Sequence, residues 1–169
     1  MNGGVPSRAP ANYFVLMLNI AVILSILVGT SLLLTGIGRW WAGMSLDAGT
    51  RGRISLSCVF TFTSTGHFIK TQAMVQMLPP AVPMREIIIY ATGVMELLFA
   101  AGLLVQRFAY VTGTCIITFL ILVLPANIYA AGNRVEIGGH GMGPAYLLMR
   151  VPLQVILIGW TYWFAVRRR

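Results

Sequence analysis

The chain has 169 residues, of which 57% are hydrophobic and only 9% are charged. A water-soluble domain carries about 25% charged residues, so this composition excludes an ordinary soluble domain and predicts a protein embedded in the hydrocarbon core of a bilayer. The formal net charge is +8, but the arginines lie between apolar runs instead of lining one polar face. Nucleic acid is therefore not expected as a partner.

The first twelve residues are rich in Gly, Pro and polar side chains, and we predict a disordered tail over residues 1–12. Five later segments are long enough to be transmembrane helices. The first of these is too long for a signal peptide and no A-x-A cleavage site follows it, so we expect it to be retained. The predicted helices are Tyr13–Gly38, Ile54–Gln76, Ile87–Val105, Phe108–Ala131 and Ala145–Val166.

The connections between these helices are short. The prolines of MLPPAVP (Met77–Pro83) must end the second helix, because proline lacks a backbone donor and clashes with the preceding turn. The glycine-rich loop Gly132–Pro144 is not a dinucleotide fingerprint, since no strand precedes it, and its His140 is expected at the surface.

Orientation follows from the Lys and Arg residues of the short loops. In a five-span arrangement, one side of the membrane holds Arg39, Arg51, Arg53, Arg107 and the arginines at 167–169, and the other holds Arg8, Arg85 and Arg134. The more basic side is cytoplasmic in a bacterial inner membrane, which predicts an external N-terminus and a cytoplasmic C-terminus. The second helix is the most polar, and the N-terminus changes side if that helix only dips into the membrane.

Polar residues inside an apolar bundle each need a partner or a purpose. From the helical rise of about 1.5 Å per residue, five of them should lie at similar depths, in the central to outer half of the bilayer. This candidate polar cluster consists of His67, Glu96, Asn127, Arg150 and Gln154.

Each member of the cluster has alternative interpretations. A carboxyl group buried alone favours its protonated form, whereas Glu96 paired with Arg150 or His67 could stay ionised; the pair would then serve packing, ligand binding or proton transfer. His67 follows Gly66, which would allow close approach of a helix or ligand. Arg150 and Gln154 share a helix face, and either could satisfy the carbonyl freed by Pro152, or Arg150 could reach outward as an interfacial anchor.

The remaining candidates for chemistry are few. Asn127 lies next to Pro125 and is expected to cap that break rather than touch a substrate. No metal site is expected, because the two histidines are far apart and no Cys lies at ligand spacing. Cys58 and Cys115 are expected to be free thiols in the cytoplasmic half of the bundle, acting as small hydrophobic residues in helix contacts.

Five short motifs lie along the second to fifth predicted helices. They are GHF (Gly66–Phe68), LPPAVP (Leu78–Pro83), TGVMELLFAAGLL (Thr92–Leu104), LPANIYAA (Leu124–Ala131) and RVPLQ (Arg150–Gln154). In this order and spacing they resemble the DoxX-like family of small integral membrane proteins, over about two-thirds of the chain. The resemblance implies an all-α helical bundle with a four-helix core at 54–166, to which the helix at 13–38 is an N-terminal addition. It marks the same five polar residues as the polar positions of that family.

The DoxX-like family is functionally mixed: it takes its name from a subunit of a thiosulfate:quinone oxidoreductase, and a distant branch includes an acetylcholine-receptor chaperone. Three hypotheses therefore stand. The first is a binding or accessory protein whose polar cluster holds a lipophilic, quinone-like molecule or supports a membrane redox partner. The second is an enzyme with His67 and Glu96 as an acid/base pair. The third is an assembly factor or chaperone for other membrane proteins. No cofactor is implied by any motif.

Overall fold

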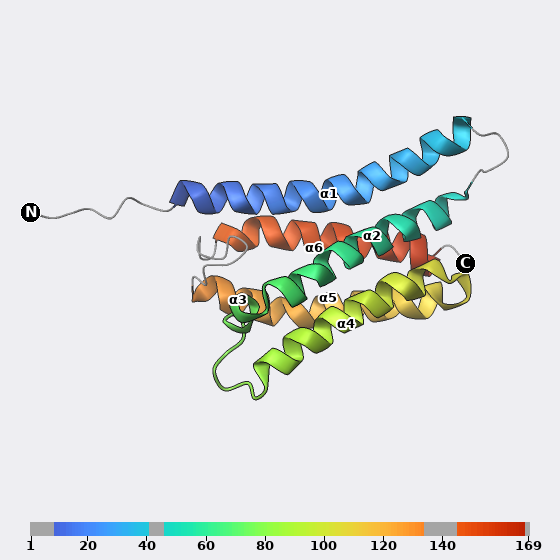
Figure 1. Cartoon of the computed structure of the whole chain (residues 1–169). Helices are drawn as coiled ribbons and strands as arrows, with labels where there is room; N and C mark the ends of the chain where they lie inside the picture. Colours follow the sequence, from blue (N-terminus) through green and yellow to red (C-terminus); the bar gives the residue numbers. More distant parts are fainter. Residues whose placement is uncertain (1–8, 41–45, 134–144, 168–169) are drawn as a thin grey trace, which may run out of the picture.

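The computed structural model describes residues 9–40, 46–133 and 145–167, and every secondary-structure element in these ranges is helical. Figure 1 shows long helices lying side by side, with the chain passing back and forth along the bundle. The elements are α1 (Ala9–Trp40), α2 (Ala48–Ile69), α3 (Thr71–Val75), α4 (Arg85–Leu104), η1 (Gln106–Phe108), α5 (Ala109–Gly132), α6 (Leu147–Thr161) and η3 (Tyr162–Arg167).

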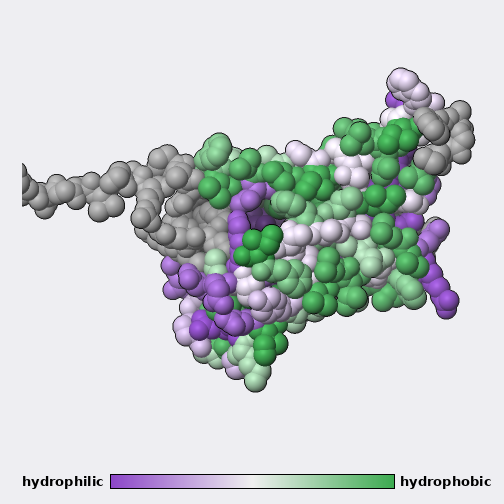
Figure 2. Space-filling view, viewed as in Figure 1, coloured by the Kyte–Doolittle hydropathy of each residue, from purple (hydrophilic) through white to green (hydrophobic). Residues whose placement is uncertain are grey.

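Four helical stretches are long and apolar enough to cross a membrane: Phe14–Trp40, Arg85–Leu104, Gln106–Gly132 and Leu147–Arg167. Many of their large apolar side chains point outward, such as Leu98 and Leu122. Figure 2 shows the result, a mostly hydrophobic band with hydrophilic residues gathered at both ends of the bundle. This distribution is the one a bilayer requires.

Two predicted boundaries are wrong. The tail predicted over residues 1–12 includes residues 9–12, which already belong to α1; residues 1–8 lie outside the described ranges. The second predicted helix begins six residues earlier than expected, at Ala48, and is interrupted at Lys70 before the short α3. The loop expected at Gly132–Pro144, with His140, lies mostly outside the described ranges.

Helix α2 is the polar member of the bundle. It contains seven Ser and Thr residues and is not among the four stretches that are long and apolar enough to cross a membrane. It nevertheless packs most extensively on α4 and then on α1, and Figure 1 shows it running from the end where α1 finishes to the end where α4 begins. Ser57, Thr63 and Ser64 of α2 are directed at α4, whereas Thr61 and Thr65 are exposed.

The apolar core is shared by the long helices. Leu27 of α1, Leu56 of α2, Leu103 of α4 and Ile116 of α5 are fully buried in one continuous cluster, which Leu153 of α6 completes. A smaller cluster joins α1 to the end of α5 and the start of α6.

The start of α2 is fixed by Asp47. Its carboxylate accepts hydrogen bonds from the hydroxyl and the backbone N–H of Thr50, and the Thr50 hydroxyl accepts one from the buried Arg53. This is the N-cap arrangement that satisfies a free N–H of the first helical turn. The hydroxyl of Thr50, followed by its backbone N–H, lowers the pKa of Asp47.

Asp47→Ala is expected to lower the free energy of unfolding by about 1 kcal/mol at neutral pH, because α2 loses its cap. A carboxyl whose pKa is lowered by folding stabilises the protein above its unfolded pKa, near 4, and loses that contribution as the pH falls through its folded pKa. Thermal unfolding in detergent should therefore show the deficit at pH 7 and a smaller deficit near pH 3. Asp47→Asn retains a capping oxygen and should recover most of the loss at pH 7.

Candidate functional site

The interface between α2 and α4 carries a regular pattern of hydrogen bonds. The hydroxyl of Ser57 donates to the carbonyl of Ala100 at 2.8 Å, and the hydroxyl of Ser64 donates to the carbonyl of Gly93 at 2.8 Å. The two contacts are seven residues apart on each helix, so the antiparallel pair keeps one register over two helical turns. Interhelical hydrogen bonds and small residues of this kind are typical of helices that associate within a membrane.

Gly93 is a point of close approach between α2 and α4. A Cβ atom added there would lie 2.7 Å from Cβ of His67 and 3.2 Å from the ring of Phe68. The sequence had suggested Gly66 for this role, but a Cβ at Gly66 would meet only the end of Met74 at 3.4 Å. The absence of a side chain at position 93 therefore allows His67 to lie against α4.

Four polar residues face one another next to Gly93. Thr63 and His67 are one turn apart on α2, and Thr92 and Glu96 are one turn apart on α4. The hydroxyl of Thr63 donates to Oε2 of Glu96 at 2.8 Å, Nδ1 of His67 lies 3.1 Å from Oγ1 of Thr92, and Nε2 of His67 lies 3.6 Å from Oε1 of Glu96. We name these four residues the α2–α4 polar cluster.

This cluster is well shielded. Glu96 is 8% exposed, and the side chain of His67 is 16% exposed. Among the described residues, His67 and Glu96 form an ion pair only with each other. We expected Glu96 to lie in one cluster with both Arg150 and His67; in the described residues its ion-pair contact is with His67.

Gln154 and Asn127 were expected in a ligand-binding cluster, but their side-chain amides donate hydrogen bonds to backbone carbonyls of α5. The side-chain amide of Gln154, which is buried, donates to the carbonyl of Leu120 and ties α6 to α5. It does not serve the carbonyl freed by Pro152 on its own helix. The amide of Asn127 donates to the carbonyl of Val123 on its own helix at 3.2 Å; α5 runs through Pro125 without the expected break.

Arg150 is separate from the α2–α4 polar cluster. No ion pair joins it to Glu96 or any other carboxylate of the described residues. Its Nε is the one buried side-chain nitrogen or oxygen in the described part of the chain that has no hydrogen-bond partner. The five predicted residues therefore form three local groups: His67 with Glu96, Gln154 and Asn127 on the backbone of α5, and Arg150.

The cysteines also differ from expectation. Cys58 and Cys115 are free, as predicted, but both are exposed on the outside of the bundle rather than buried in helix contacts. Within the described ranges, no group of three His, Cys, Asp or Glu side chains lies close enough to hold a metal ion.

Thr92 was missed from the sequence, although it lies four residues before Glu96, the spacing that places two side chains on one helix face. Thr63 lies four residues before His67, so the same spacing places it beside the imidazole. Ser57 and Ser64 were missed as well; their seven-residue spacing, matched by Gly93 and Ala100, could have indicated the α2–α4 register.

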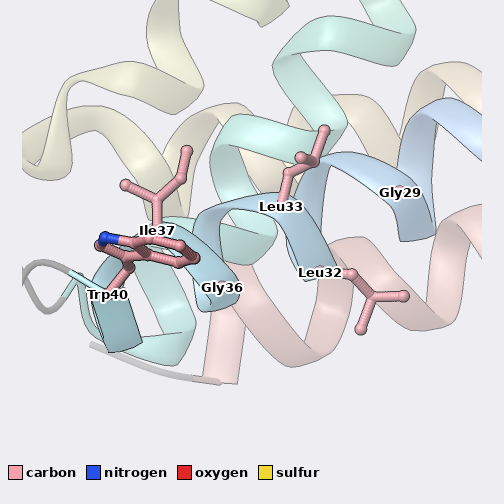
Figure 3. A pocket seen from close by; sticks show the side chains of 6 residues that line it. All are labelled: Gly29, Leu32, Leu33, Gly36, Ile37 and Trp40. Carbon is pink, nitrogen blue, oxygen red and sulfur yellow. The ribbon is translucent and has the colours of Figure 1, made fainter.

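A shallow groove of about 600 Å³ lies on the outer side of α1, away from all of these polar residues. Figure 3 shows the side chains that line it, all on one helix: Gly29, Leu32, Leu33, Gly36, Ile37 and Trp40. It contains no charged or titratable side chain, so it offers packing surface and no chemistry.

The comparisons with known proteins identify one family. Residues 56–165 match the model of a domain of unknown function, DUF8561. The chain belongs to this family. The DUF8561 match begins within α2 and ends within η3, so it contains the whole α2–α4 polar cluster and Arg150, while α1 precedes it. It is not a match to the DoxX-like family. No curated protein and no solved structure matches the chain.

Proposed function

We propose that this DUF8561 protein is a membrane-embedded binding or accessory protein, and that Arg150 holds a lipophilic, quinone-like molecule through a hydrogen-bond acceptor of that molecule. The observation that carries the proposal is the buried Nε of Arg150, which has no partner among the described residues. A buried donor without an acceptor costs about 1–3 kcal/mol, and more when the group is charged. A ligand oxygen placed there would remove that cost.

The neighbours of Arg150 favour an external acceptor. Gln154, one turn further along α6, is already bonded to Leu120. Tyr146, one turn earlier, is buried and lies close enough to Arg150 to feel the charge of its guanidinium. An arginine can anchor a helix by extending its guanidinium toward water; Arg150 as a whole is partly exposed, but its Nε is enclosed by the protein.

The choice of a quinone-like ligand rests on two arguments. A quinone is apolar enough to dissolve in the bilayer and carries carbonyl oxygens that accept hydrogen bonds from a guanidinium. The motif resemblance to the DoxX-like family, one of whose members is a subunit of a thiosulfate:quinone oxidoreductase, supports the same class of molecule and a redox partner in the membrane.

We further propose a five-span arrangement with α2 as the polar span, an external N-terminus and a cytoplasmic C-terminus. Its support is the clustering of basic residues, since Arg39, Arg51, Arg107 and Arg167 all lie at the ends of elements that meet at one end of the bundle (Figure 1). The positive-inside rule makes that end cytoplasmic. A periplasmic signal from a reporter fused at Arg169 would overturn this orientation.

The ligand is tested by native mass spectrometry of the purified protein in detergent, with decyl-benzoquinone added as the probe. We expect the wild-type protein to retain the quinone and Arg150→Met to lose at least about 90% of it, which corresponds to one hydrogen bond to a charged group. Arg107→Met, at the opposite end of the bundle, is the matched control and should bind like wild type. Equal retention by Arg150→Met and wild type would refute the proposal. Protein subunits that co-purify without bound quinone would favour the assembly-factor hypothesis instead.

A further inference from the structure

We propose that His67 and Glu96 form a proton-transfer site inside the bundle, in which one mobile proton is held between Nε2 of His67 and Oε1 of Glu96. This inference concerns the α2–α4 polar cluster and does not depend on a ligand at Arg150. It rests on the orientation of the imidazole, on the burial of both groups and on the charges that surround them.

The first step is the orientation of the imidazole. Nδ1 of His67 lies 3.2 Å from the carbonyl oxygen of Ile89 and 3.1 Å from Oγ1 of Thr92. The carbonyl can only accept, and the Thr92 hydroxyl already donates its hydrogen to that same carbonyl at 2.8 Å. Nδ1 must therefore carry a hydrogen, since both of its neighbours present acceptors. This assignment leaves Nε2 as the nitrogen that gains or loses a proton.

The second step is the position of that proton. With Nδ1–H fixed, the pair is electrically neutral when one more proton lies between Nε2 and Oε1. Either the O–H of a protonated Glu96 faces a neutral imidazole, or the O–H bond breaks, Nε2–H forms and an imidazolium faces a carboxylate. The 3.6 Å separation is longer than a hydrogen bond, so a small rotation of the Glu96 side chain completes the transfer geometry.

The third step is the energetic preference for one proton. Without it, a neutral imidazole lone pair would face a carboxylate and the buried cluster would carry a net negative charge. With a second proton, the cluster would carry a net positive charge. Both states cost free energy in a medium of low dielectric constant, so the neutral pair with one shared proton is favoured.

The surroundings contain no closer charge that would replace this pairing. On the elements packed around the cluster, the charged groups are Lys70 after α2, Arg85 and Glu86 at the start of α4, Arg150 on α6, and the arginines at the opposite end of the bundle. Glu86 is exposed and accepts a hydrogen bond from Gln72. Among the described residues, none of these groups lies within ion-pair distance of His67 or Glu96.

The His67–Glu96 pair is also accessible enough to exchange a proton with a molecule dissolved in the membrane. The side chain of His67 keeps 16% of its surface exposed, next to Phe68 and Tyr90, whose rings contact each other and are partly exposed. A membrane-dissolved weak acid or base that reaches this surface could give a proton to the pair or take one from it.

The hydroxyl of Thr63 supplies a directional test, because its bond to Oε2 stabilises the carboxylate form of Glu96. Infrared spectroscopy of the protonated carboxyl band and ¹⁵N NMR of labelled histidine report the two groups, and the chain has only four acidic residues and two histidines. Glu96→Gln and His140→Asn assign the signals. We expect Thr63→Val to increase the protonated carboxyl band of Glu96 and to decrease protonation of Nε2, while Nδ1 stays protonated.

Thr65→Val is the matched control, since the exposed Thr65 hydroxyl bonds only to the carbonyl of Phe62 on its own helix; it should leave both signals unchanged. An unprotonated Nδ1, or a Thr63→Val spectrum like that of wild type, would each overturn the proposal.

Discussion

Gly93→Ala is expected to destabilise the protein by about 1–3 kcal/mol, the usual cost of forcing an extra carbon into a well-packed contact. The added Cβ would lie 2.7 Å from Cβ of His67, an atom that cannot move unless α2 itself moves. The two helices must therefore separate, which also stretches the bond from Ser64 to the carbonyl at position 93. Thermal unfolding in detergent, followed by circular dichroism, measures the loss.

Gly29→Ala provides the control, because a Cβ at position 29 meets nothing within 4 Å. Alanine is the better helix former by about 1 kcal/mol, so this variant should be as stable as wild type or more stable. If Gly93→Ala were equally well tolerated, the close approach of α2 and α4 would not contribute to stability.

Glu96→Leu is the second change with a large expected effect, a loss of about 1–3 kcal/mol. Leucine would remove the carboxylate that accepts from Thr63 and faces Nε2 of His67, although the Thr63 hydroxyl keeps its contact with the carbonyl of Phe60, and loss of a buried hydrogen-bond partner costs about 1–3 kcal/mol. The partner is identified by double-mutant cycles measured by thermal unfolding. Glu96→Leu should couple to His67→Leu by more than about 0.5 kcal/mol, the range seen for residues in one network.

Arg150→Met serves as the comparison in the same cycles. The structure gives Arg150 no ion pair with Glu96, so the losses from Glu96→Leu and Arg150→Met should add to within about 0.5 kcal/mol. Strong coupling between Glu96 and Arg150, together with none between Glu96 and His67, would contradict the cluster described here.

The helices could be predicted from the sequence because hydropathy and length report directly on a helix that faces lipid. Four of the five predictions rest on that signal, those for α1, α4, α5 and α6, and all four helices are present. The start of α2 was placed too late, since Ala48–Arg53 contains two arginines and two glycines and gives no hydropathy signal. There the side chain of Asp47, rather than apolarity, fixes where the helix begins.

The candidate site could be predicted only in part. Depth along each helix follows from residue number, so the sequence placed His67 and Glu96 at compatible heights. Which face a residue occupies depends on the packing of neighbouring helices, and this is why Arg150 could not be separated from the pair. The exposed positions of Cys58 and Cys115 follow from the same cause, because an apolar segment does not reveal which of its faces meets lipid.

The hydroxyl contacts of α2 have a consequence for the order in which the chain is made. Ser57, Thr63, Ser64 and His67 find their partners on α4, which leaves the ribosome after α2. Until α4 arrives, α2 carries polar groups that raise its cost of insertion into lipid. In the proposed five-span arrangement, α2 is therefore expected to wait at the insertion machinery or the membrane surface and to enter together with α4. A nascent chain that stops before Arg85 should fail to hold α2 in the bilayer.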